Sequence, residues 1–165
     1  MPLTVAESLA LNDVLIDMEA SSKKHVLELL SEHLSGSASG LDRDAVFEAL
    51  IERERLGCTA ADFGLAMPHA RLATASAPVG VFARLKTAVD FDSQDAPHVD
   101  LLFCFVLPLT TSERHDIALQ GLAARMMTQP VCDALRSADD ATEILAILRA
   151  CAAVDDGDKA AGGLS

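Results

Sequence analysis

Residues 99–107 read VDLLFCFVL, an apolar run that ends at Pro108. Such a run is typical of a strand that is covered on both faces of a sheet. Shorter apolar segments predict further strands at residues 14–16, within residues 63–68 and at residues 78–85. The chain therefore supplies several strands for one largely buried sheet.

Segments with helical spacing of apolar residues alternate with these strands. Serine, threonine or aspartate stands at the start of most of them, as is common at helix N-termini. The predicted helices cover residues 23–34, 42–55, 113–128, 130–135 and 140–150. Interleaved strands and helices predict an α/β layered fold. We expect one domain over residues 1–152, and a mobile acidic tail over residues 153–165, which are small, acidic and glycine-containing.

Composition narrows the class of function. The chain has 165 residues and a formal charge of −12, with 13 basic against 25 acidic side chains. Nucleic acid is an unsuitable partner, because its phosphates are held by clustered basic residues. A protein partner with a basic face fits better. The longest apolar stretch, residues 101–109, is too short to span a bilayer, and no basic segment precedes an apolar run at the N-terminus. We expect a cytoplasmic protein without a membrane partner.

Neither the cysteines nor the histidines show the spacing of a metal site. Far apart in sequence and free of any C-x-x-C pair, the cysteines are expected to be buried, reduced thiols. They are Cys58, Cys104, Cys132 and Cys151. We expect no metal and no cofactor.

His69 is the main candidate for chemistry. Residues 63–71 read FGLAMPHAR, so an apolar strand is expected to end at Pro68 and to present the imidazole at the rim of the sheet. A neutral imidazole is a good nucleophile toward phosphorus near neutral pH. A lone histidine is also often structural, and this alternative stays open for His69.

Arg53, near the end of one predicted helix, and His115, in the first turn of another, could converge with His69. An arginine fork matches phosphate oxygens, and a histidine ring N–H could orient a phosphoryl group. Thr59 could add a hydroxyl donor. A solvated helix end and an ordinary first-turn histidine are the alternative interpretations of Arg53 and His115.

Taken together, these residues resemble the fructose/mannitol-type enzyme IIA of the bacterial phosphotransferase system, and within it the nitrogen-regulatory enzyme IIA. The likeness covers about residues 3–150. It rests on RERLGCT at 53–59, GLAMPH at 64–69, PVGVF at 78–82, VDLLF at 99–103, and the downstream His115.

The resemblance implies a mixed sheet flanked by helices and a phosphotransferase activity without metal or nucleotide. It implies that His69 accepts a phosphoryl group from the histidine phosphocarrier HPr, with Arg53 and His115 assisting. Regulated proteins, or a IIB domain, would lie downstream.

The chain departs from the family pattern around the candidate histidine. Where the family has a glycine-rich stretch and a glycine after the histidine, residues 60–63 read AADF and Ala70 follows His69. Because alanine tolerates positive φ poorly, the loop over residues 58–63 is expected to take its own path. Asp62 adds negative charge, which Arg71 is expected to offset, and Arg71 joins Thr59 as a phosphate-binding candidate.

Three functions remain open. The first is a regulatory phosphocarrier with a phosphohistidine at His69, which the resemblance favours. The second is a sugar-specific IIA that passes phosphate to the IIB domain of a fructose or mannitol transporter. The third is a non-catalytic IIA-like binding module in which the altered loop has abolished transfer.

Overall fold

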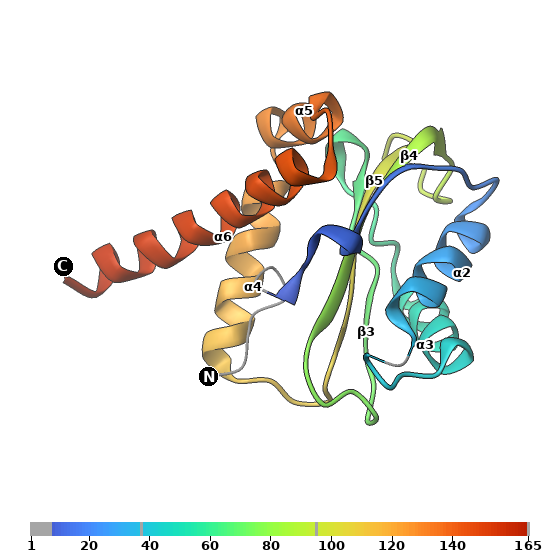
Figure 1. Ribbon diagram of the computed structural model, residues 1–165, viewed down its shortest axis with the longest axis horizontal. Coiled ribbons are helices and arrows are strands. Elements are labelled where there is room, and N and C mark those ends of the chain that lie inside the picture. Colours follow the sequence, from blue (N-terminus) through green and yellow to red (C-terminus); the bar gives the residue numbers. More distant parts are fainter. Residues whose placement is uncertain (1–7, 37, 95, 165) are drawn as a thin grey trace.

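The computed structural model describes residues 8–36, 38–94 and 96–164, and for residues 153–164 it describes the backbone only. A mixed five-stranded sheet lies between two layers of helices (Figure 1), so the predicted α/β class is confirmed. The strands are β1 (Val14–Met18), β2 (Leu65–Ala66), β3 (His69–Arg71), β4 (Val79–Val89) and β5 (Val99–Leu107).

The apolar run of residues 99–107 forms β5, an interior strand of the sheet. β5 pairs with β4 in antiparallel fashion and with β2 and β3 in parallel, while β1 runs parallel to β4 on its far side. The order β1-β4-β5-β2 leaves β2 and β3 together along one edge. Every residue of 101–107 is buried, as expected for a strand covered on both faces.

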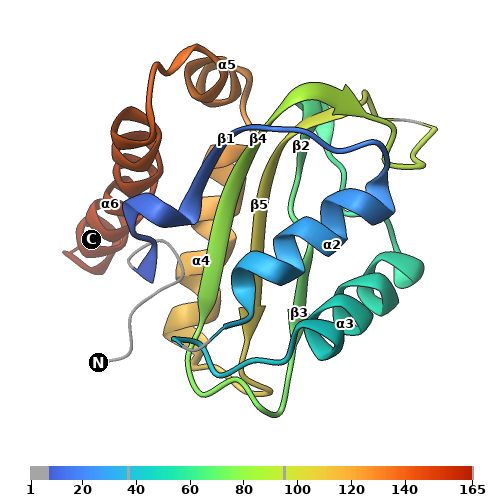
Figure 2. The same cartoon turned by 45° about the vertical axis from the view of Figure 1, so that its right-hand side comes forward.

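Side chains of β5 alternate between two apolar cores, because successive residues of a strand point to opposite faces. The helices on the two faces are α2 (Lys23–Leu34), α3 (Arg43–Leu56), α4 (Glu113–Met126), α5 (Gln129–Ser137) and α6 (Ala141–Leu164). Leu101, Phe103, Phe105 and Leu107 join the core beneath α4, α5 and α6, whereas the residues between them join the core beneath α2 and α3. Figure 2 shows the two helical layers on opposite sides of the sheet.

The predicted N-terminal caps are present at three helices. The side chains of Ser22, Asp42 and Ser112 accept hydrogen bonds from the backbone N–H groups three residues further on, at the starts of α2, α3 and α4. Gly57 follows α3, a position where glycine is common, but its φ of 172° is extended backbone that any residue adopts. The end of α3 therefore does not depend on glycine at this position.

The prediction that the strand before His69 ends at Pro68 is wrong. The strand is interrupted at Met67 and Pro68 and resumes as β3, with His69 opposite Phe105 of β5. Pro68 has no N–H to donate, but its carbonyl accepts a hydrogen bond from the Phe105 N–H at 3.1 Å, so the alignment with β5 is kept across the break. His69 is thus the first residue of an edge strand and lies within the sheet, not beyond its end.

The last helix is longer than expected. The sequence places its end near Ala150, yet α6 continues to Leu164. Residues 151–164 contain no proline, so each of them can donate its N–H to the helix, and the glycines of the segment weaken the helix without ending it. The side chains of 153–164 and the whole of Ser165 lie outside the described residues, so the mobility of the segment stays a prediction.

Gly64 closes the loop before β2 with a φ of +75°. A Cβ at this position would lie 2.5 Å from Nη2 of Arg136 and 2.9 Å from Oδ1 of Asp100. Those two side chains form a bidentate pair with N–O distances of 2.7 and 2.8 Å, and Arg136 also donates to the Phe63 carbonyl. The pair thereby fixes the loop that leads toward His69.

Replacing Gly64 by alanine is expected to lower the free energy of unfolding by about 2–4 kcal/mol, because left-handed backbone strain adds to the displaced Arg136–Asp100 pair. Gly40→Ala is the matched control: its φ is +70° but no atom lies within 4 Å of the added Cβ. It should cost only the backbone strain, about 1–2 kcal/mol. Urea unfolding measures both, and equal losses would contradict the role of the pair.

Candidate functional site

The imidazole of His69 is held by its own backbone neighbourhood. Its Nδ1 lies 2.7 Å from the carbonyl oxygen of Met67, and its ring stacks on Phe105 with centroids 5.0 Å apart and planes at 9°. A carbonyl oxygen can only accept a hydrogen bond, so Nδ1 must carry the proton. In the neutral ring Nε2 then carries the lone pair. His69 is half-buried, and Nε2 is the nitrogen that can act as a nucleophile.

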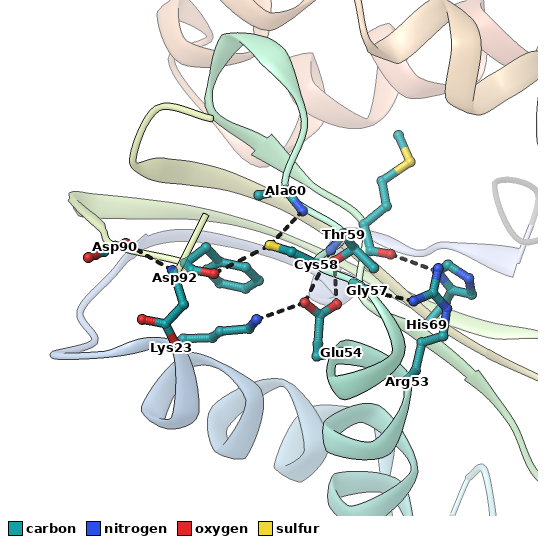
Figure 3. A network of polar contacts seen from close by, with 12 residues as sticks. Lys23, Arg53, Glu54, Gly57, Cys58, Thr59, Ala60, His69, Asp90 and Asp92 are labelled. Carbon is teal, nitrogen blue, oxygen red and sulfur yellow. Dashed lines mark hydrogen bonds and ion pairs between the residues drawn. The ribbon is translucent and has the colours of Figure 1, made fainter. Parts of the chain in front are cut away.

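Arg53 belongs to the last turn of α3 and lines the same open cleft as His69, which has a volume of about 520 Å³. Its Nη1 donates to the Gly57 carbonyl oxygen at 2.9 Å. Figure 3 shows this contact beside the His69 ring. One nitrogen of the guanidinium is thereby anchored, and the planar group has further N–H donors for an anion.

Thr59 and Arg71 also line the cleft, but both already have partners. The Thr59 hydroxyl donates to the carboxylate of Glu54. Arg71 Nη1 donates to the Pro108 carbonyl at 2.9 Å and to the Thr111 hydroxyl at 3.1 Å. An anion in the cleft would have to share or replace these hydrogen bonds. Thr59 and Arg71 therefore stay phosphate-binding candidates, but less favourable ones than Arg53.

His115 is placed differently from the other four predicted residues. Its side chain is buried, with 7% exposure, and it does not line the cleft, whereas its neighbour Asp116 does. The ring Nδ1 lies 3.6 Å from the Asp116 carboxylate, and neither ring nitrogen has a hydrogen-bond partner among the described residues. The structure therefore brings Arg53, Thr59, His69 and Arg71 together and keeps His115 behind Asp116.

Two acidic residues, Asp116 and Glu54, lie at or beside the site although they were not predicted as site residues. Asp116 lines the cleft, and its Oδ1 lies 3.6 Å from Nη2 of Arg71. Glu54 is buried in the last turn of α3, although it is charged. A signal for Glu54 exists in the sequence, because it continues the buried stripe of Val46 and Leu50 at intervals of four residues. A carboxylate on an apolar stripe indicates a paired, positioned group.

Within the loop over residues 58–63, backbone strain falls only at the last residue, and a path that differs from the family pattern stays a prediction. Phe63 has a φ of 68°, in the left-handed region that favours glycine, while Ala61 is extended. Asp62 does not line the cleft, and Arg71 faces Asp116. The expectation that Arg71 offsets the charge of Asp62 is therefore replaced by an Arg71–Asp116 contact.

The pKa of Asp116 lies below its ordinary value, mainly because the Thr111 hydroxyl donates to its carboxylate, with further help from His115 and Arg71. A lowered folded-state pKa contributes stability above the unfolded value of about 3.9 and loses it as the pH falls through the folded value. Thr111→Val should raise the Asp116 pKa toward the ordinary range. A carboxyl-carbon NMR titration checks this, with Thr110→Val, in the same exposed loop, as control; an unchanged pKa in Thr111→Val would contradict the assignment.

The cysteines and possible metal ligands form no second centre in the described part of the chain. Cys104, Cys132 and Cys151 are buried and form no disulfide, and burial raises the pKa of each thiol, whereas Cys58 is exposed, contrary to expectation. No group of three or more histidine, cysteine or acidic side chains within residues 8–36, 38–94 and 96–152 is placed to hold a metal ion. In the same residues no helix has the length and apolar character needed to cross a membrane.

The fold and the cleft define a class: a small α/β protein with a half-buried histidine at the edge of a mixed sheet, its Nε2 free for chemistry and an arginine beside it. The family model described as "Phosphoenolpyruvate-dependent sugar phosphotransferase system, EIIA 2" matches residues 7–151. The chain belongs to this family, as the sequence resemblance predicted.

Three members of the family are similar to this chain over most of its length. The nitrogen regulatory protein of Bradyrhizobium diazoefficiens is 35% identical over 148 residues, which cover 90% of this chain and 95% of that protein. The crystal structure of nitrogen regulatory protein IIA-Ntr from Neisseria meningitidis superimposes with a TM-score of 0.81 at 34% identity, covering 87% and 98% of the two chains. The fructose-specific EIIA component of Haloferax volcanii is 32% identical over 128 residues, covering 78% and 83%.

Proposed function

We propose that this protein is a phosphocarrier that accepts a phosphoryl group on Nε2 of His69 from an HPr-type histidine phosphocarrier. The observation that carries the proposal is the 2.7 Å bond from Nδ1 to the Met67 carbonyl, which leaves the Nε2 lone pair for attack. That lone pair forms the new N–P bond while the donor's N–P bond breaks and its electron pair stays on the donor imidazole. The proton stays on Nδ1 throughout, donated to the Met67 carbonyl oxygen.

Arg53 supplies positive charge where it is needed. Phosphoryl transfer asks a protein mainly for alignment and for charge around the equatorial oxygens. Arg53 is the arginine in the cleft whose anchor, the Gly57 carbonyl, leaves most of its N–H donors for those oxygens. The resemblance also gives His115 an assisting role, but its buried ring lies outside the cleft, so a phosphoryl oxygen would reach its unpartnered nitrogens only after a local rearrangement.

A regulatory role is preferred over sugar transport because the relatives at 34–35% identity that cover nearly the whole chain are nitrogen regulatory proteins. A phosphoryl group adds roughly two negative charges to the cleft. Exposed Met127 and half-buried Leu119 line the same cleft, so the added charge would alter its affinity for protein partners. Transfer onward to a IIB domain is the second candidate, favoured by the likeness to the fructose-specific component of Haloferax volcanii.

Incubation with phosphoenolpyruvate, enzyme I and HPr tests the proposal. The protein should gain one acid-labile, base-stable phosphate per chain, and only when all three components are present. Absence of label on a folded protein would refute the phosphocarrier function and leave a non-catalytic binding module. Rapid transfer of the label from this protein to an added fructose- or mannitol-type IIB domain would favour the transport role, provided that phosphorylation does not change the binding of this protein to other proteins.

A further inference from the structure

Glu54 is a buried carboxylate with an unusual number of partners. Its side chain is 4% exposed, and Lys23 at the start of α2 approaches it at 3.0 Å. The backbone N–H of Thr59 donates to the same carboxylate at 3.2 Å, and the Thr59 hydroxyl donates to its other oxygen. Figure 3 shows Lys23, Glu54 and Thr59 joined in this way.

From Thr59 the contacts lead to the candidate nucleophile. The Thr59 carbonyl accepts the backbone N–H of Met67 at 3.3 Å, and the Met67 carbonyl accepts Nδ1–H of His69 at 2.7 Å. A second backbone bond, from the Ala61 N–H to the Leu65 carbonyl at 2.8 Å, fastens the same loop along the strand. The position of the Met67 carbonyl, and with it the choice of protonated nitrogen on His69, therefore depends on a loop that Glu54 holds.

The same loop anchors the arginine. Gly57, whose carbonyl accepts Nη1 of Arg53 at 2.9 Å, stands two residues before Thr59. Arg53 and Glu54 are consecutive residues in the last turn of α3. The Arg53 side chain enters the cleft, and the Glu54 side chain holds the Thr59 loop.

Stability alone does not account for this arrangement. Removing two charges from water costs several kcal/mol, and a buried ion pair can often be replaced by apolar side chains of similar volume without loss of stability. Glu54, which also accepts two hydrogen bonds from Thr59, is the more deeply buried partner. Lys23 retains 15% exposure and lies over the ring of Phe91. The ion pair of Lys23 and Glu54 therefore serves to hold the loop at Thr59.

We infer that Glu54, braced by Lys23, is a positioning residue for phosphoryl transfer: it holds the Thr59 loop so that Met67 keeps His69 in the tautomer with a free Nε2 and Gly57 keeps Arg53 in the cleft. This inference rests on the proposed function and goes beyond it, because Glu54 acts through His69 and Arg53 and does not touch the phosphoryl group.

The double replacement Lys23→Met and Glu54→Met tests the inference, since it removes both charges together and preserves most of the packed volume. The transfer rate at saturating phosphorylated HPr should fall about 10- to 100-fold, as misplacements of about an ångström do, while the affinity for the donor changes little. Nitrogen-15 NMR of unphosphorylated His69 should change from a single Nδ1–H tautomer to a mixture. Glu54→Gln, which keeps an acceptor for Thr59, should retain most of the rate and the single tautomer.

Glu52→Met is the matched control, because Glu52 lies on the same helix with 68% of its side chain exposed and pairs with Arg55. It should leave the rate and the tautomer unchanged. A folded double variant with wild-type rate and tautomer would overturn the inference. If the double variant does not fold, Thr59→Val, which removes one bond to Glu54, must shift rate and tautomer in the same direction, and no shift would overturn it. A wild-type protein that takes no phosphate refutes the proposed function, whereas the tautomer measurement still decides the role of Glu54.

Discussion

Replacement of His69 by alanine is expected to abolish phosphoryl acceptance while leaving the fold intact. The imidazole is half-buried on an edge strand, so its loss removes one ring stack on Phe105 and leaves the core of the sheet unchanged. Among the described residues that line the cleft, no other side chain is a histidine or a cysteine, so none of them is a nucleophile of comparable strength. Label should fall to the level of the reaction without enzyme I.

His98→Ala is the control for this result, because His98 is exposed and belongs to the loop before β5. It should be labelled at the wild-type rate and to the same extent. Circular dichroism and urea unfolding establish that both variants are folded. Equal labelling of wild type and His69→Ala would show that the phosphate resides elsewhere.

The second large effect is expected at Arg53. Its removal takes positive charge from the equatorial oxygens, and losses of one preorganised charged or hydrogen-bonding donor typically cost about 10²- to 10³-fold in rate. Arg53→Ala should show such a decrease in rapid-quench measurements at saturating phosphorylated HPr. Arg53→Lys should recover only part of the rate, since an ammonium group lacks the planar fork that binds Gly57 and an anion together.

Arg55→Ala is the matched control for Arg53, because Arg55 lies two residues further along α3, is exposed and pairs with Glu52. It should transfer phosphate at the wild-type rate. Equal rates for Arg53→Ala and Arg55→Ala would remove Arg53 from the site and restore its interpretation as a solvated helix end.

The sequence was sufficient for the elements that depend on local chemistry. The apolar run VDLLFCFVL and the serines before α2 and α4 predicted where the central strand and these two helices lie. The interruption at Pro68 could not be predicted, because whether a strand resumes after a proline depends on its partner. Here the Phe105 N–H reaches the Pro68 carbonyl and carries the pairing across.

The site could be predicted only in part, because tertiary contacts also decide which bonds its residues make. His69, Arg53, Thr59 and Arg71 do line one cleft, but which bonds they already make is set by tertiary contacts. The role of Glu54 depends on Lys23 and Thr59, which approach it from another helix and from a loop. The burial of His115 depends on how α4 packs on the sheet, and a helical pattern alone does not separate a first-turn histidine that enters the cleft from one that lies behind it.

The central claim is that the phosphoryl group is carried by Nε2 of His69. Phosphorus–nitrogen correlation NMR on the protein labelled with nitrogen-15 and phosphorylated through HPr tests it directly. We predict one phosphohistidine, assigned to His69, with phosphorus bonded to Nε2 and a proton retained on Nδ1 toward the Met67 carbonyl. Phosphorus on Nδ1 of His69, or on any other residue, would contradict the account.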